Sequence, residues 1–244
     1  MGDWPPSTER LDWYSVKPDD AQGAEPLYVW DAPVRLFHWL LVVLVTTSVI
    51  TGLAGSQAFT WHERSGIAIL ALLLFRWLWG FAGSTTARFT HFVRGPRAVA
   101  AFVHALLRDR PYPVAGHNPL GGWMVVALLV ALTAQAGSGL FADDEVFSSG
   151  PLADRVGNAT SRVLTSFHGS NAWVVVTLAC IHIAAVLFHL RVRGENLVRP
   201  MITGRRTWPR DRARPGLRFA PNWVAALVLV LSVAAVLAAL AHFG

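Results

Sequence analysis

Metal ions in proteins are often bound by histidine nitrogen or cysteine sulfur, and histidine is the abundant one of the two in this sequence. The 244 residues include nine histidines and a single cysteine. A histidine inside an apolar span is costly and usually faces a partner, a cavity or the interior of a helix bundle. Five histidines lie in or at the edges of long apolar stretches: His38, His62, His168, His182 and His189. The other four lie where water or an interface can satisfy them and are interpreted as background: His91, His104, His117 and His242.

The spacing between His168 and His182 suggests two ligands on one helix. They are 14 residues apart, which is only about 40° short of four full helical turns, so both face the same way. Their separation along the helix axis is about 21 Å, and the hydrocarbon core of a bilayer is about 30 Å thick. One helix face would therefore offer a ligand near each membrane surface.

Each of these two ligands has a candidate partner at a similar depth. By their expected depth in the membrane, His38 pairs with His182, and His62 pairs with His168. A haem iron with two neutral imidazole ligands is saturated, which favours electron transfer over oxygen chemistry. His189 is only about 20° off the face of His182 and remains an alternative partner for His38. The competing interpretation is that all five are structural histidines of an ordinary helical bundle.

Five apolar stretches are long enough to position these histidines in a membrane. They cover residues 36–55, 64–82, 121–141, 169–190 and 222–242. Hydrophobic residues make up 53% of the chain and charged residues 15%, against roughly a quarter in soluble domains. The sequence therefore predicts an all-α membrane protein. Residues 1–30 are polar and show no signal-peptide pattern.

The basic residues mark one side of this membrane protein. Seventeen of the 21 Lys and Arg residues fall in the N-terminal segment, the 83–120 loop, the 191–221 loop and their edges. The positive-inside rule then predicts a cytoplasmic N-terminus and, after five spans, a periplasmic C-terminus in a bacterial inner membrane. The net charge of +6 is thus interpreted as a topology marker, and nucleic-acid binding is not expected.

Several other chemistries are disfavoured. The lone Cys180 excludes a disulfide framework and a CxxCH attachment of haem. His62 and Glu63 begin a string that resembles the HExxH zinc motif, but Gly66 stands at its fifth position. Glycines in or beside the spans allow close helix packing or leave room for a porphyrin, and the sequence leaves both open: Gly52, Gly66, Gly137, Gly139 and Gly169.

Arg76 is the only arginine well inside a predicted span. Its side chain could reach toward water at the span end, or it could bind a haem propionate, since Arg pairs with carboxylates in bidentate fashion. Arg35 is a weaker candidate for the same role.

Two segments outside the spans have a distinct character. The segment 142–165, here called the acidic loop, carries four acidic residues and two arginines, so it is either a solvated loop or a docking surface for a basic partner. Residues 96–107 have the pattern of an amphipathic helix that begins at a proline and lies on the cytoplasmic interface.

Several motifs resemble the bacterial membrane cytochrome b family that includes cytochrome b561 and the b-type subunits of nickel-iron hydrogenases. The resemblance extends over residues 28 to 206. It is carried by the VWDAPVRLFHW string at 29–39, His62 with Gly66, RWLWGF at 76–81, HNPLGG at 117–122, His168 with His182, and GENLVRPMITG at 194–204.

The resemblance implies a four-helix bundle that holds two non-covalent b-type haems, with a fifth C-terminal helix outside it. The implied ligands are His38 and His62 from the first two helices, and His168 and His182 from the fourth. The spacing in the fourth helix favours His182 over His189. Many family members have Glu after the first of these two histidines, whereas this chain has Gly169.

The family also implies a function. We expect an electron carrier between the quinone pool and a periplasmic cytochrome c or a dehydrogenase- or hydrogenase-type subunit, with no catalytic residue of its own. The alternative is a membrane anchor or assembly subunit without haem. The expected organisation is a polar segment at 1–30, a dihaem domain at 31–206, and a basic linker with the fifth span at 207–244.

Overall fold

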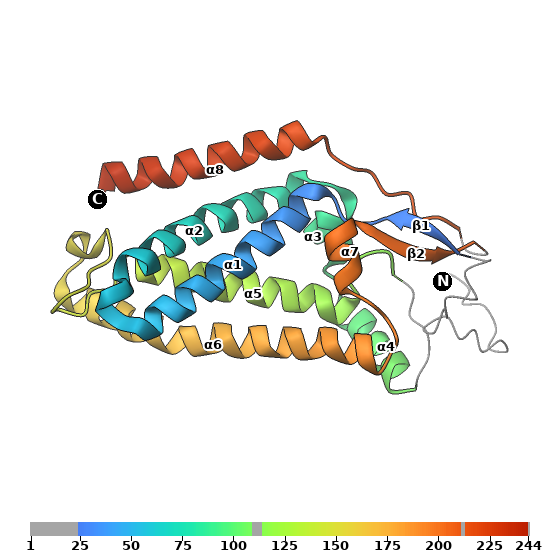
Figure 1. The fold of residues 1–244 in the computed structure, drawn as a ribbon, viewed down its shortest axis with the longest axis horizontal. Helices are drawn as coiled ribbons and strands as arrows, with labels where there is room; N and C mark the ends of the chain where they lie inside the picture. The colour runs from blue at the N-terminus through green and yellow to red at the C-terminus, as the bar shows by residue number, and fades with distance from the viewer. Residues whose placement is uncertain (1–23, 109–113, 211–212, 244) are drawn as a thin grey trace.

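Long apolar helices run side by side through the computed structural model, which describes residues 24–108, 114–210 and 213–243 (Figure 1). They are α1 (Ala32–Ala54), α2 (Phe59–Ala82), α5 (Pro119–Gly139), α6 (Asn158–Arg191) and α8 (Asn222–Phe243). Four apolar helical stretches are long enough to cross a bilayer, and the first of them, Ala32–Ala82, contains both α1 and α2. Those two helices lie antiparallel around the short turn η2 (Gly55–Ala58).

Most predicted spans match these helices to within a few residues, but the fourth does not. The predicted span 169–190 begins too late, because α6 already starts at Asn158. Residues 158–168 are largely polar, so hydropathy does not reveal that the helix extends beyond the apolar run. The last part of the acidic loop is therefore helical. Of the polar segment predicted at residues 1–30, residues 1–23 lie outside the described part of the chain.

Two of the bundle helices begin with the same local signal, a capping side chain followed by proline. The Asp31 carboxylate accepts a hydrogen bond from the Val34 amide at 2.8 Å, and proline occupies the first turn of α1. The Asn118 side chain accepts from the Gly121 amide at 2.6 Å at the start of α5. Such caps satisfy amides that the helix leaves unpaired.

A two-stranded antiparallel sheet, absent from the all-α prediction, closes one end of the bundle. Strand β1 (Ala24–Tyr28) pairs with β2 (Arg205–Pro209), with Tyr28 opposite Arg205. The short helix α7 (Val198–Thr203) precedes β2 and ends at Gly204, which has a φ of 78°. A Cβ on Gly204 would lie 2.8 Å from the Trp30 carbonyl oxygen, so this turn requires glycine.

The sheet and the acidic loop mark opposite ends of the molecule, here called the sheet end and the loop end (Figure 1). The sheet end also carries η3 (Thr85–Ala87), α3 (Phe89–Phe92) and α4 (Pro96–Leu107), and α4 is the predicted amphipathic helix. The loop end carries η2 and η4 (Ala153–Arg155). Helix α8 ends at the loop end, opposite β1.

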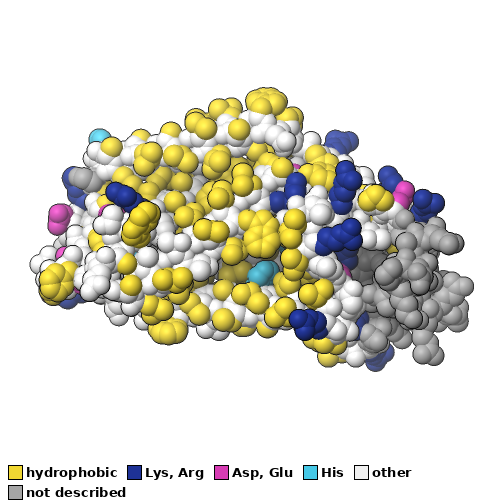
Figure 2. Space-filling view, viewed as in Figure 1, with side chains coloured by type: hydrophobic (Ala, Val, Ile, Leu, Met, Phe, Trp, Pro, Cys, Tyr) yellow, Lys and Arg dark blue, Asp and Glu magenta, His cyan; other side chains and the backbone are white. Residues whose placement is uncertain are grey.

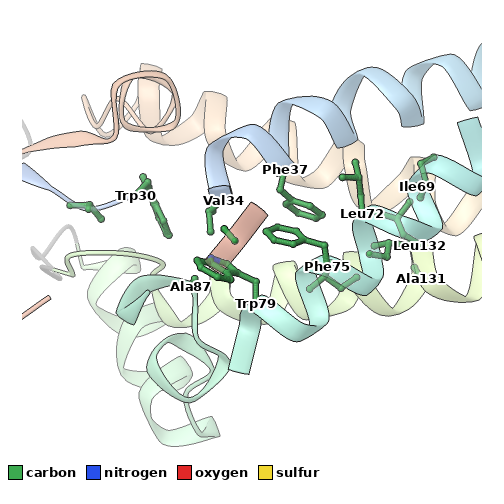
Figure 3. Close-up of a cluster of buried hydrophobic side chains, with 14 of the residues drawn as sticks. Trp30, Val34, Phe37, Ile69, Leu72, Phe75, Trp79, Ala87, Ala131 and Leu132 are labelled. Carbon is green, nitrogen blue, oxygen red and sulfur yellow. The ribbon is translucent and has the colours of Figure 1, made fainter. Parts of the chain in front are cut away.

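The helices pack in pairs around a core that is richest toward the sheet end. α1 packs on α2, α2 on α5, α5 on α6, and α8 on the outside of α2. Figure 3 shows the centre of this core, where the rings of Phe75 and Trp79 stack at 5.8 Å and Phe37 lies beside Phe75. Trp79 is fully buried, and its indole N–H donates to Asp31. The cap of α1 is thereby tied to α2.

The surface has the character of a protein embedded in lipid. Figure 2 shows hydrophobic side chains over the middle of the molecule, with most of the visible Lys and Arg side chains at the sheet end. Together with the four apolar helical stretches, this identifies a multi-pass membrane protein.

Candidate functional site

The structure brings His62 of α2 and His168 of α6 together near the loop end. Their ring centroids lie 6.0 Å apart with the ring planes nearly perpendicular. Two imidazoles on opposite sides of one metal ion, each with a bond of about 2 Å, would place their centroids about 6 Å apart. The pair thus has the spacing of two ligands that share one ion, although 106 residues separate them in sequence.

A cavity of about 660 Å³ adjoins this pair. Its volume lies within the usual range for cofactor sites, about 300–1,000 Å³. Residues of α1, α2, α5 and α6 line it, together with the start of the acidic loop, and most of them are apolar. The cavity includes both histidines and four of the five glycines singled out in the sequence: Gly52, Gly66, Gly139 and Gly169.

These four glycines have two distinct roles. A Cβ on Gly139 would lie 2.8 Å from His168 Cε1, and one on Gly52 would lie 3.2 Å from His62 Cε1, so these two glycines make room for the imidazole rings. A Cβ on Gly66 or Gly169 would meet nothing within 4 Å. They leave open space beside the histidines, which is where a flat cofactor would have to lie.

Hydrogen bonds hold both rings in a defined orientation. His62 Nδ1 lies 2.9 Å from the Ser48 carbonyl oxygen, and His168 Nδ1 lies 3.0 Å from the Gln135 carbonyl oxygen. With the proton on Nδ1, each ring donates to a carbonyl and leaves Nε2 as the nitrogen that can bind a metal, as is usual in metal sites. The His168 Nε2 lies 3.2 Å from the Gln135 side-chain amide nitrogen, which would have to give way to an ion. Asn171 donates to the Gln135 side chain at 2.8 Å and steadies it. Gln135 and Asn171 therefore supply the polar surroundings of His168 that Gly169 cannot supply.

The donor set favours a prosthetic group over a bare metal ion. Among the described residues, no group of three or more His, Cys, Asp or Glu side chains is placed to hold a metal. Two imidazoles leave a six-coordinate ion four ligands short, and a porphyrin supplies four nitrogens in one plane. The residues at the loop end therefore fit a haem.

A second set of nitrogen groups lies toward the sheet end. His38 of α1 and His182 of α6 are close enough to interact electrostatically. His38 Nδ1 is buried and has no hydrogen-bond partner among the described residues. Arg76 of α2 is only 2% exposed, and its Nη1 also lacks a partner within this part of the chain. Unpaired buried donors are costly, so they indicate a group that the protein alone does not provide.

Residues 29–204 match the family model described as prokaryotic cytochrome b561. The chain belongs to the prokaryotic cytochrome b561 family. It is accordingly a b-type cytochrome of the membrane that binds haem b and transfers electrons.

Curated relatives of this b561 chain carry consistent names. It is 26% identical to a probable Ni/Fe-hydrogenase B-type cytochrome subunit of Rhodobacter capsulatus, over 76% of this chain and 83% of the relative. A protein of the same name from Bradyrhizobium diazoefficiens is 24% identical, over 76% and 88%. The probable Ni/Fe-hydrogenase 1 B-type cytochrome subunit of Escherichia coli K12 is 21% identical, over 74% and 90%. No solved structure matches the chain.

The two remaining candidates, Arg35 and His189, take part in contacts at the sheet end of this b561 fold. Arg35 Nη1 donates to the Ile202 carbonyl and ties α1 to α7, while its Nε is buried without a partner in the described residues. His189 Nδ1 lies 2.9 Å from Glu195 Oε2, and the same carboxylate pairs with Arg206. His189 thus joins the end of α6 to β2.

Interpreting His117 as a background histidine is not consistent with the structure. Its Nδ1 is buried without a partner among the described residues, between the rings of Trp30 and Phe92. The sequence placed it in a loop just before a span, where water was expected, but α3 and the segment before α1 cover it. Its only sequence signal is membership of the HNPLGG motif at 117–122. His104 and His242 are exposed, as the background interpretation requires.

Proposed function

We propose that this protein holds two b-type haems, each between two histidines, and conducts electrons through the membrane between the quinone pool and a redox partner at the loop end. His62 and His168 bind the haem at the loop end. His38 and His182 bind the haem at the sheet end. A haem held by each histidine pair would supply one-electron redox chemistry.

The observation that carries this proposal is the facing pair His62 and His168 beside the 660 Å³ cavity. Helices that merely packed together would close this space, whereas Gly66 and Gly169 keep it open. Gly66 and Gly169 therefore support the interpretation that the glycines leave room for a porphyrin, and not the alternative that they allow close helix packing. Gly52 and Gly139 leave room for the two imidazole rings beside the position that the iron would occupy.

At the sheet end, the proposed haem site is supported by two positively charged side chains. The buried Arg76 side chain and the partly satisfied Arg35 would face the negative propionates of a haem held by His38 and His182. His189 is not assigned as a ligand in this arrangement, because the 14-residue spacing from His168 that the family resemblance implies falls on His182. The His189 Nδ1 interacts with Glu195.

The topology that we propose has five spans, α1, α2, α5, α6 and α8, in a bacterial inner membrane. The sheet end lies in the cytoplasm and the loop end in the periplasm, because the arginines gather at the sheet end. β1 then lies in the cytoplasm and the end of α8 in the periplasm. Reporter fusions after Arg108 and after Phe243 test this: cytoplasmic and periplasmic activity, respectively, are expected.

The proposed partner is a hydrogenase-type subunit or a soluble cytochrome c on the periplasmic side. The hydrogenase assignment follows the names of the relatives, and the cytochrome c assignment follows the acidic loop beside the loop-end cavity. Quinol and quinone are the proposed exchange substrates at the other end of the electron path.

A redox difference spectrum of the purified protein tests the proposal. We expect b-type bands and two haems per chain. His38→Ala, His62→Ala, His168→Ala and His182→Ala should each remove one haem, whereas the exposed control His104→Ala should keep both. His189→Ala should also keep both. Protein that is folded but contains no haem would instead support the non-redox anchor, and loss of haem in His189→Ala but not in His182→Ala would overturn the sheet-end pairing.

A further inference from the structure

His117 is half-buried, and its Nδ1 atom is buried as an unused hydrogen-bonding group. It directly precedes Asn118, whose side chain caps α5, so the cap fixes the backbone beside the imidazole. The ring lies 4.6 Å from the Trp30 ring and 4.9 Å from the Phe92 ring, measured between centroids. Two aromatic side chains therefore hold the imidazole in place, while its Nδ1 has no partner among the described residues.

Arg76 lies against the same aromatic wall. Its Cζ is 5.8 Å from the centroid of Phe92 and 5.2 Å from that of Phe89. Burial, together with the positive charge of Arg76 and of the nearby His182 and His38, lowers the pKa of His117 to about 3. The His117 imidazole is therefore neutral at pH 7 and donates a single N–H.

The described residues leave some of the nitrogen atoms in this pocket without a hydrogen-bond partner. Asp31 is the acidic group near Arg76, but its two oxygens accept hydrogen bonds from the Val34 amide and the Trp79 indole. One arginine nitrogen and one histidine nitrogen remain buried without acceptors in the described chain. Buried donors left in this way are costly, and a carboxylate would accept a hydrogen bond from both.

We propose that His117 and Arg76 form a carboxylate pocket that holds a propionate of the sheet-end haem, with the His117 N–H as a positioning hydrogen bond. This inference rests on the proposed function, because that function supplies the haem. It adds a residue from the start of α5 to a site whose proposed iron ligands come from α1 and α6.

Two substitutions separate the hydrogen bond from the packing. His117→Phe keeps a ring between Trp30 and Phe92 but has no donor. His117→Asn loses the ring but keeps an N–H close to the position of Nδ1. The control is His104→Phe, the same change at an exposed histidine of α4.

The measurement is the rate at which haem passes from purified protein to excess apomyoglobin, with the sheet-end haem identified as the one missing from His38→Ala. We expect His117→Phe to release that haem at least about ten times faster than the unsubstituted protein, as loss of a charge-assisted hydrogen bond implies. His117→Asn should stay within about threefold, and His104→Phe should be unchanged. The loop-end haem should be released at the same rate in all variants, which also reports an intact bundle.

An unchanged rate of haem release from His117→Phe would overturn the proposed pocket. Equal acceleration of haem release in His117→Phe and His117→Asn would also overturn it, because that result indicates that the ring acts only through packing. An unsubstituted protein without haem is a different result and would overturn the proposed function itself.

Discussion

Replacing Gly66 with leucine should remove the loop-end haem without unfolding the protein. Gly66 lies four residues after His62 on α2, so it is on the same helix face, one turn further along. It lines the cavity, and a Cβ there would meet nothing within 4 Å. A leucine side chain would therefore enter the space that we assign to the porphyrin.

The energetics separate haem exclusion from destabilisation. Leucine avoids the cost of glycine inside a helix, which is about 0.8–1.0 kcal/mol, so α2 itself should become slightly more stable. An added Cβ at this position meets no atom within 4 Å that would offset this gain. Four added carbon atoms, however, fill part of the 660 Å³ cavity directly beside His62. Haem loss should thus occur in a protein that is still folded.

The assay is the haem-to-protein ratio from the pyridine haemochrome spectrum, together with helicity from circular dichroism. We expect one haem per chain in Gly66→Leu, with unchanged helicity. The matched control is Gly137→Leu on α5, because a Cβ on Gly137 also meets open space but the residue does not line the cavity. Two haems in Gly66→Leu, or equal loss in Gly137→Leu, would refute the assignment of this cavity to haem.

Three further predictions concern the residues around the sites. In Gly139→Ala, the added methyl group would lie 2.8 Å from His168 Cε1, so the ring must shift, and the low-spin signal of the loop-end haem in electron paramagnetic resonance should weaken. Burial alone would raise the pKa of Glu195, but its histidine and arginine partners lower it below the ordinary 4.5, so its stabilisation is present above pH 4.5 and is lost as the pH falls through the folded value. Glu195→Gln should accordingly lower the melting temperature at pH 7 and flatten its decline below pH 5, and an unchanged pH profile would contradict this. Changing Asp143 and Glu145 to amides should slow electron transfer to a basic soluble cytochrome c about tenfold at low salt and little at high salt, whereas an equal rate at low salt would leave the acidic loop as a solvated segment.

The spans could be predicted from the sequence because lipid imposes a simple requirement. A helix that crosses the bilayer needs about 20 apolar residues, and that run is visible in one dimension. Where helix formation depended on something else, prediction failed. The polar first turns of α6, residues 158–168, carry no hydropathy signal. The pairing of β1 with β2 joins segments that are about 180 residues apart, and no local pattern announces it.

The candidate ligands were also accessible from the sequence, because helical geometry converts the spacing of His168 and His182 into a direction and a depth. What spacing could not provide was the surroundings of each ring. The contact between Gly139 and His168, and the network of Gln135 and Asn171, join α5 to α6 and exist only after those helices pack. The open space at Gly66 is likewise a property of the packed bundle.

By itself, then, the sequence determined a multi-pass helical membrane protein and its family resemblance, and it predicted that four histidines pair by depth, because these inferences depend on composition and helical period. The tertiary structure alone decided which side chains became buried. His117 looked like a loop residue, yet the packing of Trp30 and Phe92 around it leaves its Nδ1 without a partner among the described residues. Burial is a property of the neighbours that folding brings together, and a neighbour distant in sequence leaves no mark on the residue it covers.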